Sequence, residues 1–226
     1  MTKDVKISRY QLSLLIIGFI FGESAISGLG SSAGQDAWFS FLIALAGGFI
    51  LMVIYTKISL LNPGKTLIEI LKSVFGRYIG SIFAILYIWY FVHLGSIVIR
   101  HLGEFSVIEI YPETPIIFLI GSLALLLVYT VKSGLEVMGR ISELFVPILI
   151  FMVILLFFIS FPLYEFNNLR PFLEKGLKPV FRTSFSMLTF PFGETVLFLM
   201  IFPFINRRKE LQKVSLISLM VIGFIL

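Results

Sequence analysis

Apolar residues fall in long runs along this sequence, and short polar segments separate them. A membrane-spanning helix needs about 17–25 predominantly apolar residues. The predicted spans, with boundaries good to a few residues, are about residues 10–31, 38–61, 79–103, 115–131, 141–162 and 183–204. A seventh apolar run begins near Val214 and reaches Leu226. A half-inserted helix would expose unsatisfied backbone groups to lipid, so about six and a half spans favour a truncated piece of a longer protein.

The composition agrees with an all-α integral membrane protein. Of the 226 residues, 58% are hydrophobic and 25 are Phe, and the mean hydropathy is +1.01. A soluble domain of this size does not bury so much apolar material. The absence of Cys excludes disulfides and thiol chemistry. We therefore predict a single transmembrane domain over residues 1–226, in contact with the lipid bilayer.

Basic residues predict the orientation. With a cytoplasmic N-terminus, 13 Lys and Arg residues fall on the inner side and 5 fall outside or near outer span ends. Because cytoplasmic loops are enriched in Lys and Arg, this bias favours an N-terminus inside. The net charge of +5 is accounted for by these short segments, so we expect no nucleic-acid partner.

One tripeptide occurs in two of the predicted spans. Phe21-Gly22-Glu23 lies near the middle of the first span, and Phe192-Gly193-Glu194 lies in the sixth, directly after Pro191. Matched breaks in corresponding spans are a sequence indicator of a transporter-like binding site. Five spans separate the starts of these two segments, and an odd number reverses the direction of the chain. The pattern therefore predicts inverted repeats, with spans 1 and 6 broken at equivalent depth.

The segment between the second and third spans predicts a short amphipathic helix. Asn62-Pro63-Gly64 is typical of a turn. Thr66 and Glu69 have the spacing of a capping box, and Gly76 is placed to end the helix. The helix is expected to lie on the inner membrane interface or on the bundle, either as a plain connection or in a gating role.

The two glycines and the two glutamates are the first candidate ligand-binding residues. In broken helices at Gly22 and Gly193, free amides can hold a carboxylate and free carbonyls an ammonium group; the alternative is close helix packing. An ionisable group at the bilayer centre costs on the order of 3 kcal/mol. Glu23 and Glu194 are therefore expected to receive a ligand ammonium or a proton, or else to cap amides or pair within the bundle.

The third span adds further candidates. Tyr90 and His93 are three residues apart and share a helix face; His93 can equally be a structural hydrogen-bonding residue. Arg100 and Glu104 have the i, i+4 spacing of an ion pair near the outer end, which either orients the span or forms an external gate. Asp36 is interpreted as an interfacial or capping residue.

The sequence contains no constellation that indicates an enzyme. It lacks a metal-spaced His or Cys cluster, a P-loop and a Gly-x-Ser-x-Gly motif. We expect no catalysis, no metal site and no cofactor.

Several stretches resemble the B subunit of GerA-type spore germinant receptors. The resemblance runs from about residue 8 to the end. A loop motif at residues 167–179 (NNLRPFLEKGLKP) carries most of it. Two short segments, 63–69 (PGKTLIE) and 76–80 (GRYIG), and Arg100 with Glu104-Phe105 add to it. In the first span this chain departs from the family, because Glu23 follows Gly22 where a small-residue glycine motif is frequent.

The resemblance implies a permease-like fold of the APC superfamily (LeuT-like), with ten spans in two inverted five-span repeats. The first repeat would be about residues 8–162, and the second would begin within about 180–226. It also implies a multi-pass subunit of the spore inner membrane that binds a small nutrient, typically an amino acid, and acts with A and C subunits. By the same resemblance the third span borders the pocket, at Tyr90.

Two other functions remain open from the sequence. One is an amino-acid/proton symporter of the APC superfamily with the same fold. The other is a structural membrane subunit with a vestigial pocket. Uptake of labelled amino acid would favour the symporter over a receptor. The lack of both uptake and ligand binding would favour the structural subunit.

Overall fold

The computed structural model of the chain describes residues 6–27, 31–165, 171–174 and 176–226. The helices of this part are α1 (Arg9–Ser27), α2 (Ala37–Leu61), α3 (Leu67–Glu109), α4 (Ile116–Ser133), α5 (Leu135–Ser160), α6 (Leu177–Met187) and α7 (Leu211–Ile225). Each predicted apolar segment overlaps one of them, although α6 covers only the first residues of the predicted sixth span. Residues 167–170 and 175 of the loop motif, and the predicted extension of the first span through 28–30, lie outside the described residues.

Four helical segments of the described residues are long and apolar enough to cross a membrane. They are Ala33–Leu61, Leu67–Glu109, Ile116–Ser133 and Leu135–Leu163. The regular elements of the described residues are helices, and the only β-pairing among them is one isolated bridge. Both observations agree with an all-α membrane protein.

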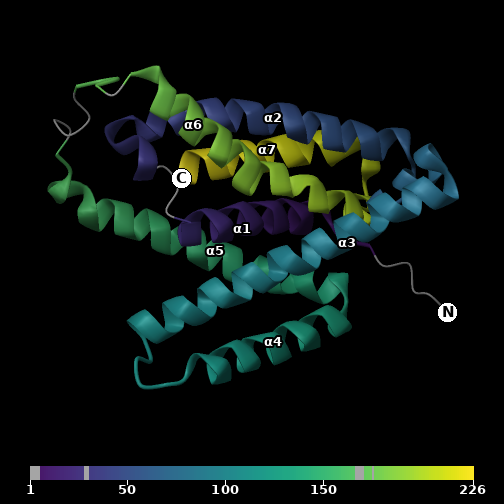
Figure 1. Cartoon of the computed structure of the whole chain (residues 1–226), viewed down its shortest axis with the longest axis horizontal. Coiled ribbons are helices and arrows are strands. Elements are labelled where there is room, and N and C mark those ends of the chain that lie inside the picture. The colour runs from purple at the N-terminus through teal and green to yellow at the C-terminus, as the bar shows by residue number, and fades with distance from the viewer. Residues whose placement is uncertain (1–5, 28–30, 166–170, 175) are drawn as a thin grey trace.

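The centre of the molecule is a group of four elements, α1, α2, α6 and α7 (Figure 1). Helix α1 packs against α7 and α5, while α2 packs against α6 and α7. Their facing sides bury Ile16, Ile20, Met52 and Leu219. The Ser218 hydroxyl donates a hydrogen bond to Ser13 Oγ at 2.8 Å, which links α7 to α1 across this apolar interior.

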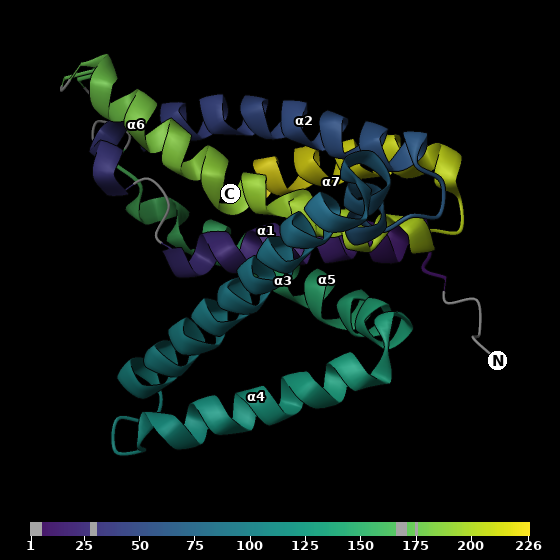
Figure 2. The same cartoon turned by 45° about the vertical axis from the view of Figure 1, so that its right-hand side comes forward.

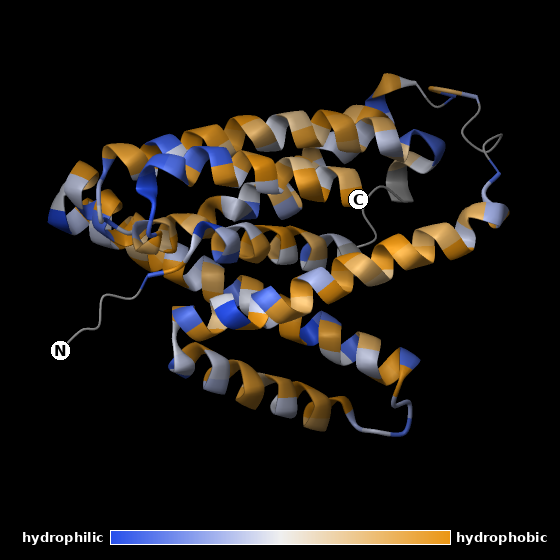
Figure 3. Ribbon diagram, turned by 180° about the vertical axis from the view of Figure 1, so that it is seen from behind, coloured by the Kyte–Doolittle hydropathy of each residue, from blue (hydrophilic) through white to orange (hydrophobic). Residues whose placement is uncertain are grey.

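Helices α3 and α4 diverge from this central group (Figure 2). Helix α3 contacts α4, and α4 contacts α5, but α4 contains no buried residue. Apolar side chains such as Phe118, Leu125 and Phe151 are exposed. The helices are coloured hydrophobic along most of their length, with polar residues toward the loops (Figure 3). Such surfaces are suited to contact with lipid tails.

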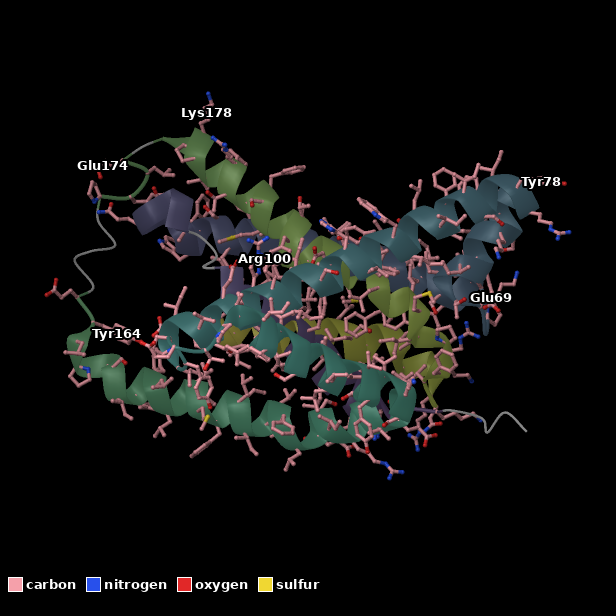
Figure 4. All side chains as sticks on the ribbon, turned by 60° about the horizontal axis from the view of Figure 1, so that its bottom comes forward. Glu69, Tyr78, Arg100, Tyr164, Glu174 and Lys178 are labelled. Carbon is pink, nitrogen blue, oxygen red and sulfur yellow. The ribbon has the colours of Figure 1, made fainter. Side chains whose placement is uncertain are left out.

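The connections gather at two opposite ends of the molecule. The start of α1 and the α2–α3, α4–α5 and α6–α7 connections lie at one end, called here the Arg9 end (Figure 1). The start of α2, the α3–α4 connection and the start of α6 lie at the other, the Asp36 end. Glu69 and Tyr78 lie at the first end, and Glu174 and Lys178 at the second (Figure 4). Successive connections therefore alternate between the two ends, in the order that the distribution of Lys and Arg residues predicts.

The predicted short helix before the third span is confirmed. Thr66 and Glu69 form the capping box, with Thr66 N donating to Glu69 Oε2 at 2.7 Å. Gly76 interrupts α3 with φ 76° and ψ 176°, a conformation that is essentially restricted to glycine. Gly80 then packs against the backbone of Lys72, so the short helix folds back closely on the start of the span.

At the Asp36 end, a polar contact ties the segment before α6 to the start of α2. Asp36 precedes α2 but makes no side-chain cap. Instead Leu173 N donates to its Oδ1 at 3.0 Å, so the carboxylate satisfies a loop amide rather than a helix terminus. The ring of Phe172 lies 5.7 Å from Trp38 and 5.4 Å from Phe39, centroid to centroid. The capping alternative for Asp36 is therefore wrong.

At the Arg9 end, the start of α1 is joined to the segment that follows the sixth span. Ile7 N donates to Phe204 O at 2.9 Å, and Asn206 N donates to Ile7 O at 3.0 Å. Glu210 accepts a hydrogen bond from Arg9 and lies 3.5 Å from Arg207. The hydrogen bond from Arg9, with the positive charge of Arg207, lowers the pKa of Glu210. Both charges therefore favour an ionised carboxylate at this junction.

We predict that Gly76→Ala lowers the stability of the protein by about 1–3 kcal/mol, because a Cβ strains the backbone at this φ and ψ. Gly95→Ala is the matched control, since Gly95 lies in a regular part of the same helix and an added Cβ meets no atom within 4 Å. It should be neutral or slightly stabilising. Thermal unfolding in detergent, followed by circular dichroism, measures both; equal midpoints would contradict the role of Gly76.

Candidate functional site

The sixth apolar segment is not a continuous α-helix. Helix α6 leads into a π-helical stretch, η4 (Leu188–Phe192), and then into a 3-10 helix, η5 (Gly193–Met200). Phe190 is the non-helical residue, with φ −133° and ψ 114°. The residue before a proline is disfavoured in the α region, and proline has no N–H to donate. The Phe190-Pro191 sequence therefore accounts for the interruption, which lies just before Gly193.

The first span behaves differently. Helix α1 is regular through Gly22 and Glu23 and ends at Ser27, so the break predicted at Gly22 is wrong for the described residues. A helical glycine costs only about 1 kcal/mol relative to alanine, and no proline follows it. A Cβ on Gly22 would meet no atom within 4 Å. Gly22 is therefore neither a break nor a close packing contact.

The two Phe-Gly-Glu segments nevertheless lie side by side. The rings of Phe19 and Phe198 are 5.7 Å apart, and the carboxyl groups of Glu23 and Glu194 interact electrostatically. As residue numbers rise along α1, they fall along its neighbour. The first and sixth segments are therefore antiparallel, as the predicted topology requires.

Two tyrosines hold the second half of the interrupted segment. The Tyr55 hydroxyl of α2 donates to Gly193 O at 3.2 Å. The Tyr90 hydroxyl of α3 bonds to Glu194 Oε1, also at 3.2 Å. Glu194 is only 6% exposed, and its second oxygen, Oε2, is buried without a hydrogen-bond partner among the described residues. A buried acceptor without a donor is costly, which makes Glu194 a ready acceptor for a ligand or a proton.

A cavity of about 480 Å³ lies beside this arrangement. Its polar lining comes from α2, α3 and the interruption, and the rest is apolar; the lining residues are Tyr55, Phe83, Leu86, Tyr87, Tyr90, Thr189, Gly193 and Val196. Apolar walls with a few convergent polar groups are typical of small-molecule sites. A second cavity, of about 540 Å³, lies toward the Asp36 end and includes Ser24, Trp38 and Met187, but none of its described lining residues has an ionisable side chain.

Other sequence-predicted residues lie apart from the cavity. His93 is exposed on α3, and its ring stacks on Trp89 with the ring centroids 5.5 Å apart. The Arg100 guanidinium donates to Glu104 Oε1 at 2.8 Å, on an exposed surface. The structure thus brings Glu23, Tyr90, Gly193 and Glu194 together, and does not place His93 with them.

Three contributors were not identified from the sequence. Tyr55 lies in an apolar run that gives no sign of its contact with Gly193. His101 interacts electrostatically with Glu23 across α1 and α3. Gly47 and Gly48 of α2 form a notch for the interruption, since a Cβ on Gly48 would lie 2.8 Å from the Phe192 ring. The adjacent glycines in the second span were the available signal, because small residues mark close helix contacts in membranes.

These features define an α-helical membrane protein in which an interrupted segment carries a buried carboxyl group and borders a cavity. A sequence profile described as spore germination protein, that of the spore permeases, matches residues 6–226. The chain therefore belongs to the spore germination protein family of permease-like membrane proteins.

Curated relatives carry the same description. Spore germination protein KB of Bacillus subtilis (strain 168) is 34% identical over 226 residues, covering 99% of this chain and 61% of the relative. Spore germination protein YndE of the same strain is 26% identical, covering 94% and 60%. Spore germination protein A2 is 31% identical over 147 residues, covering 64% and 40%. The chain spans at most about three fifths of these relatives. No solved structure matches it significantly.

We predict that Gly48→Ala destabilises the protein by about 1–3 kcal/mol, because the added methyl group overpacks against the Phe192 ring. Gly22→Ala is the control within the same central group, since its Cβ has open space. It should change stability by less than about 0.5 kcal/mol or raise it slightly. Thermal midpoints in detergent compare the two variants. If Gly22→Ala lowered the thermal midpoint as much as Gly48→Ala, the proposed contact between Gly48 and Phe192 would be contradicted.

Proposed function

We propose that this protein is the membrane subunit of a spore germinant receptor that binds a small nutrient, an amino acid, and thereby triggers germination. The observation that carries the proposal is the cavity at the interruption, where Tyr55 and Tyr90 hold Gly193 and Glu194. Membership of the germination protein family supplies the biological setting. The proposal places the protein in the spore inner membrane, with A and C subunits as partners.

The chemistry of the cavity suits an amino acid. An ammonium group needs hydrogen-bond acceptors and negative charge, which Gly193 O, the Tyr90 oxygen and Glu194 supply. The interrupted helix leaves backbone amides that suit a carboxylate. The apolar walls, Phe83, Leu86 and Val196, suit a side chain without charge. The volume of about 480 Å³ lies in the range of small-molecule pockets.

The helix contacts support the inverted repeat as part of this proposal. If α1 corresponds to α6 and α2 to α7, a two-fold axis in the membrane plane exchanges the α1–α7 contact with the α6–α2 contact. Both contacts are present. The same axis maps the α2–α7 contact onto itself, and that contact is present too. The orientation that we propose has the N-terminus and the Arg9 end in the cytoplasm.

Nutrient binding acts only if it favours one of two states of the protein. The interruption is a suitable switching element, because it has contacts with α1, α2 and α3. A ligand that bridges Tyr90 of α3 and the backbone at Gly193 would hold these elements at one spacing. We propose that the partner subunits respond to this change in spacing.

A panel of nutrients tests the proposal. Spores whose only germinant receptor contains this subunit are exposed to single amino acids, and germination is scored by the loss of optical density. A saturable response to one or a few amino acids is expected. The absence of a response to every nutrient would contradict receptor function, provided that the protein is detected in the spore membrane.

A symporter is the second candidate function, and the interacting Glu23 and Glu194 carboxyl groups favour it, because proton-coupled carriers use buried carboxyl groups. Saturable uptake of labelled amino acid into proteoliposomes, driven by a pH gradient, would establish transport. Binding without uptake supports the receptor. The lack of both would indicate a structural subunit.

We predict that Glu194→Gln raises the half-saturating nutrient concentration about tenfold or more, since a hydrogen bond to a charged group contributes about 1.5–3 kcal/mol. Glu143→Gln is the control, because Glu143 is exposed on α5, away from the cavity. Dose–response curves for germination measure the change, with immunoblots of spore membranes to verify equal amounts of protein. An unchanged curve for Glu194→Gln rules out an essential charge at this position.

A further inference from the structure

Glu23 and Glu194 are two acids that are buried close to each other. The two side chains are 7% and 6% exposed. Phe19 and Phe198 are in ring contact. Glu23 follows Phe19 by four residues, and Glu194 precedes Phe198 by four, so in antiparallel neighbours the carboxyl groups lie about one turn beyond the rings. Their electrostatic interaction agrees with this position.

Two carboxyl groups that face each other in a low-dielectric site do not both ionise without a compensating positive charge. Among the described residues, the ionisable groups seen to interact with the pair are His101, which interacts with Glu23, and Tyr90, which bonds to Glu194. Tyr55 and Tyr87 lie beside Tyr90. The ionisable residues of the described helices α5 and α7, which pack against α1, lie toward the Arg9 end: Glu136, Arg140, Glu143 and Lys213.

We infer that Glu23 and Glu194 together hold one positive charge: a proton when the cavity is empty, and the ammonium group of a ligand when it is occupied. This inference rests on the proposed function, and it specifies the ligand as an amine that enters in exchange for one proton. Inorganic cations are poorer partners for this site, because an ammonium group also donates hydrogen bonds to Gly193 O and the Tyr90 oxygen.

The geometry connects the cavity to the pair. Gly193 and Tyr90 line the cavity, and the Tyr90 hydroxyl contacts Glu194 Oε1 directly behind them. Oε2 of Glu194, without a partner among the described residues, is a site for the proton shared with Glu23. When an ammonium group arrives, the O–H bond of the protonated carboxyl group breaks, both carboxylates become ionised, and the proton leaves.

The released proton passes from the carboxyl oxygen to water, and the hydrogen bonds and the negative charge that held it then hold the ammonium group. One ammonium group enters and one proton leaves, so the net charge of the site is the same before and after binding.

The empty state is tested by infrared spectroscopy of the full chain in lipid nanodiscs at pH 7. The C=O stretching region should show one protonated, buried carboxyl group per chain in the wild type and in Glu143→Gln. Glu194→Gln should lose this band, because Glu23 then no longer faces a second carboxyl group and lies within electrostatic reach of His101. The absence of the band in the wild type, or its persistence in Glu194→Gln, would overturn the shared proton.

The exchange is tested by adding methylammonium chloride to the same nanodiscs in weak buffer with a pH indicator. One proton should be released per bound methylammonium by the wild type, and none by Glu194→Gln. Sodium chloride at equal ionic strength should release none. Equal release with both salts, or undiminished release from Glu194→Gln, would overturn the ammonium-for-proton exchange.

The two proposals fail separately. If spores respond to nutrients but no proton is released, the receptor assignment holds and the exchange is wrong. If the carboxyl band and the proton release are found but spores that carry the protein respond to no nutrient, the exchange holds and receptor function is wrong.

Discussion

The arrangement of this protein depends on the interruption at Phe190-Pro191. A broken helix leaves backbone groups that lipid cannot hydrogen-bond, so the surrounding helices must satisfy and shield them. Helix α2 does both: Tyr55 donates to Gly193 O, and the notch at Gly47 and Gly48 accepts the side chains of Leu188 and Phe192. The cavity exists because this support replaces the regular packing of an unbroken helix.

Local patterns in the sequence were sufficient for much of the fold. The apolar runs located the helices, and the Thr66–Glu69 spacing and Gly76 located a cap and a bend. These features depend on residues within a few positions of one another. The opposite directions of the first and sixth segments were also accessible, because a repeated tripeptide and the charge bias together predict them.

The remaining features depend on contacts between distant parts of the chain. Gly22 was expected to break α1, but a glycine permits a break without forcing one, and only the sixth segment has the proline that does so. Asp36 was expected to cap α2, yet a loop amide more than 130 residues away takes its carboxylate. Tyr55 and His101 could not be assigned from the sequence, because spacing along one helix does not reveal which neighbour faces it.

The tie between Asp36 and Leu173 limits the way in which the central helices can move. Leu173 precedes the start of α6 by four residues, and the Phe172 ring rests on Trp38 and Phe39 of α2. Any separation of α6 from α2 at this end must therefore first release one hydrogen bond and one aromatic cluster. Separation of α6 from α2 at the Asp36 end therefore requires contacts to break that the interruption itself does not make.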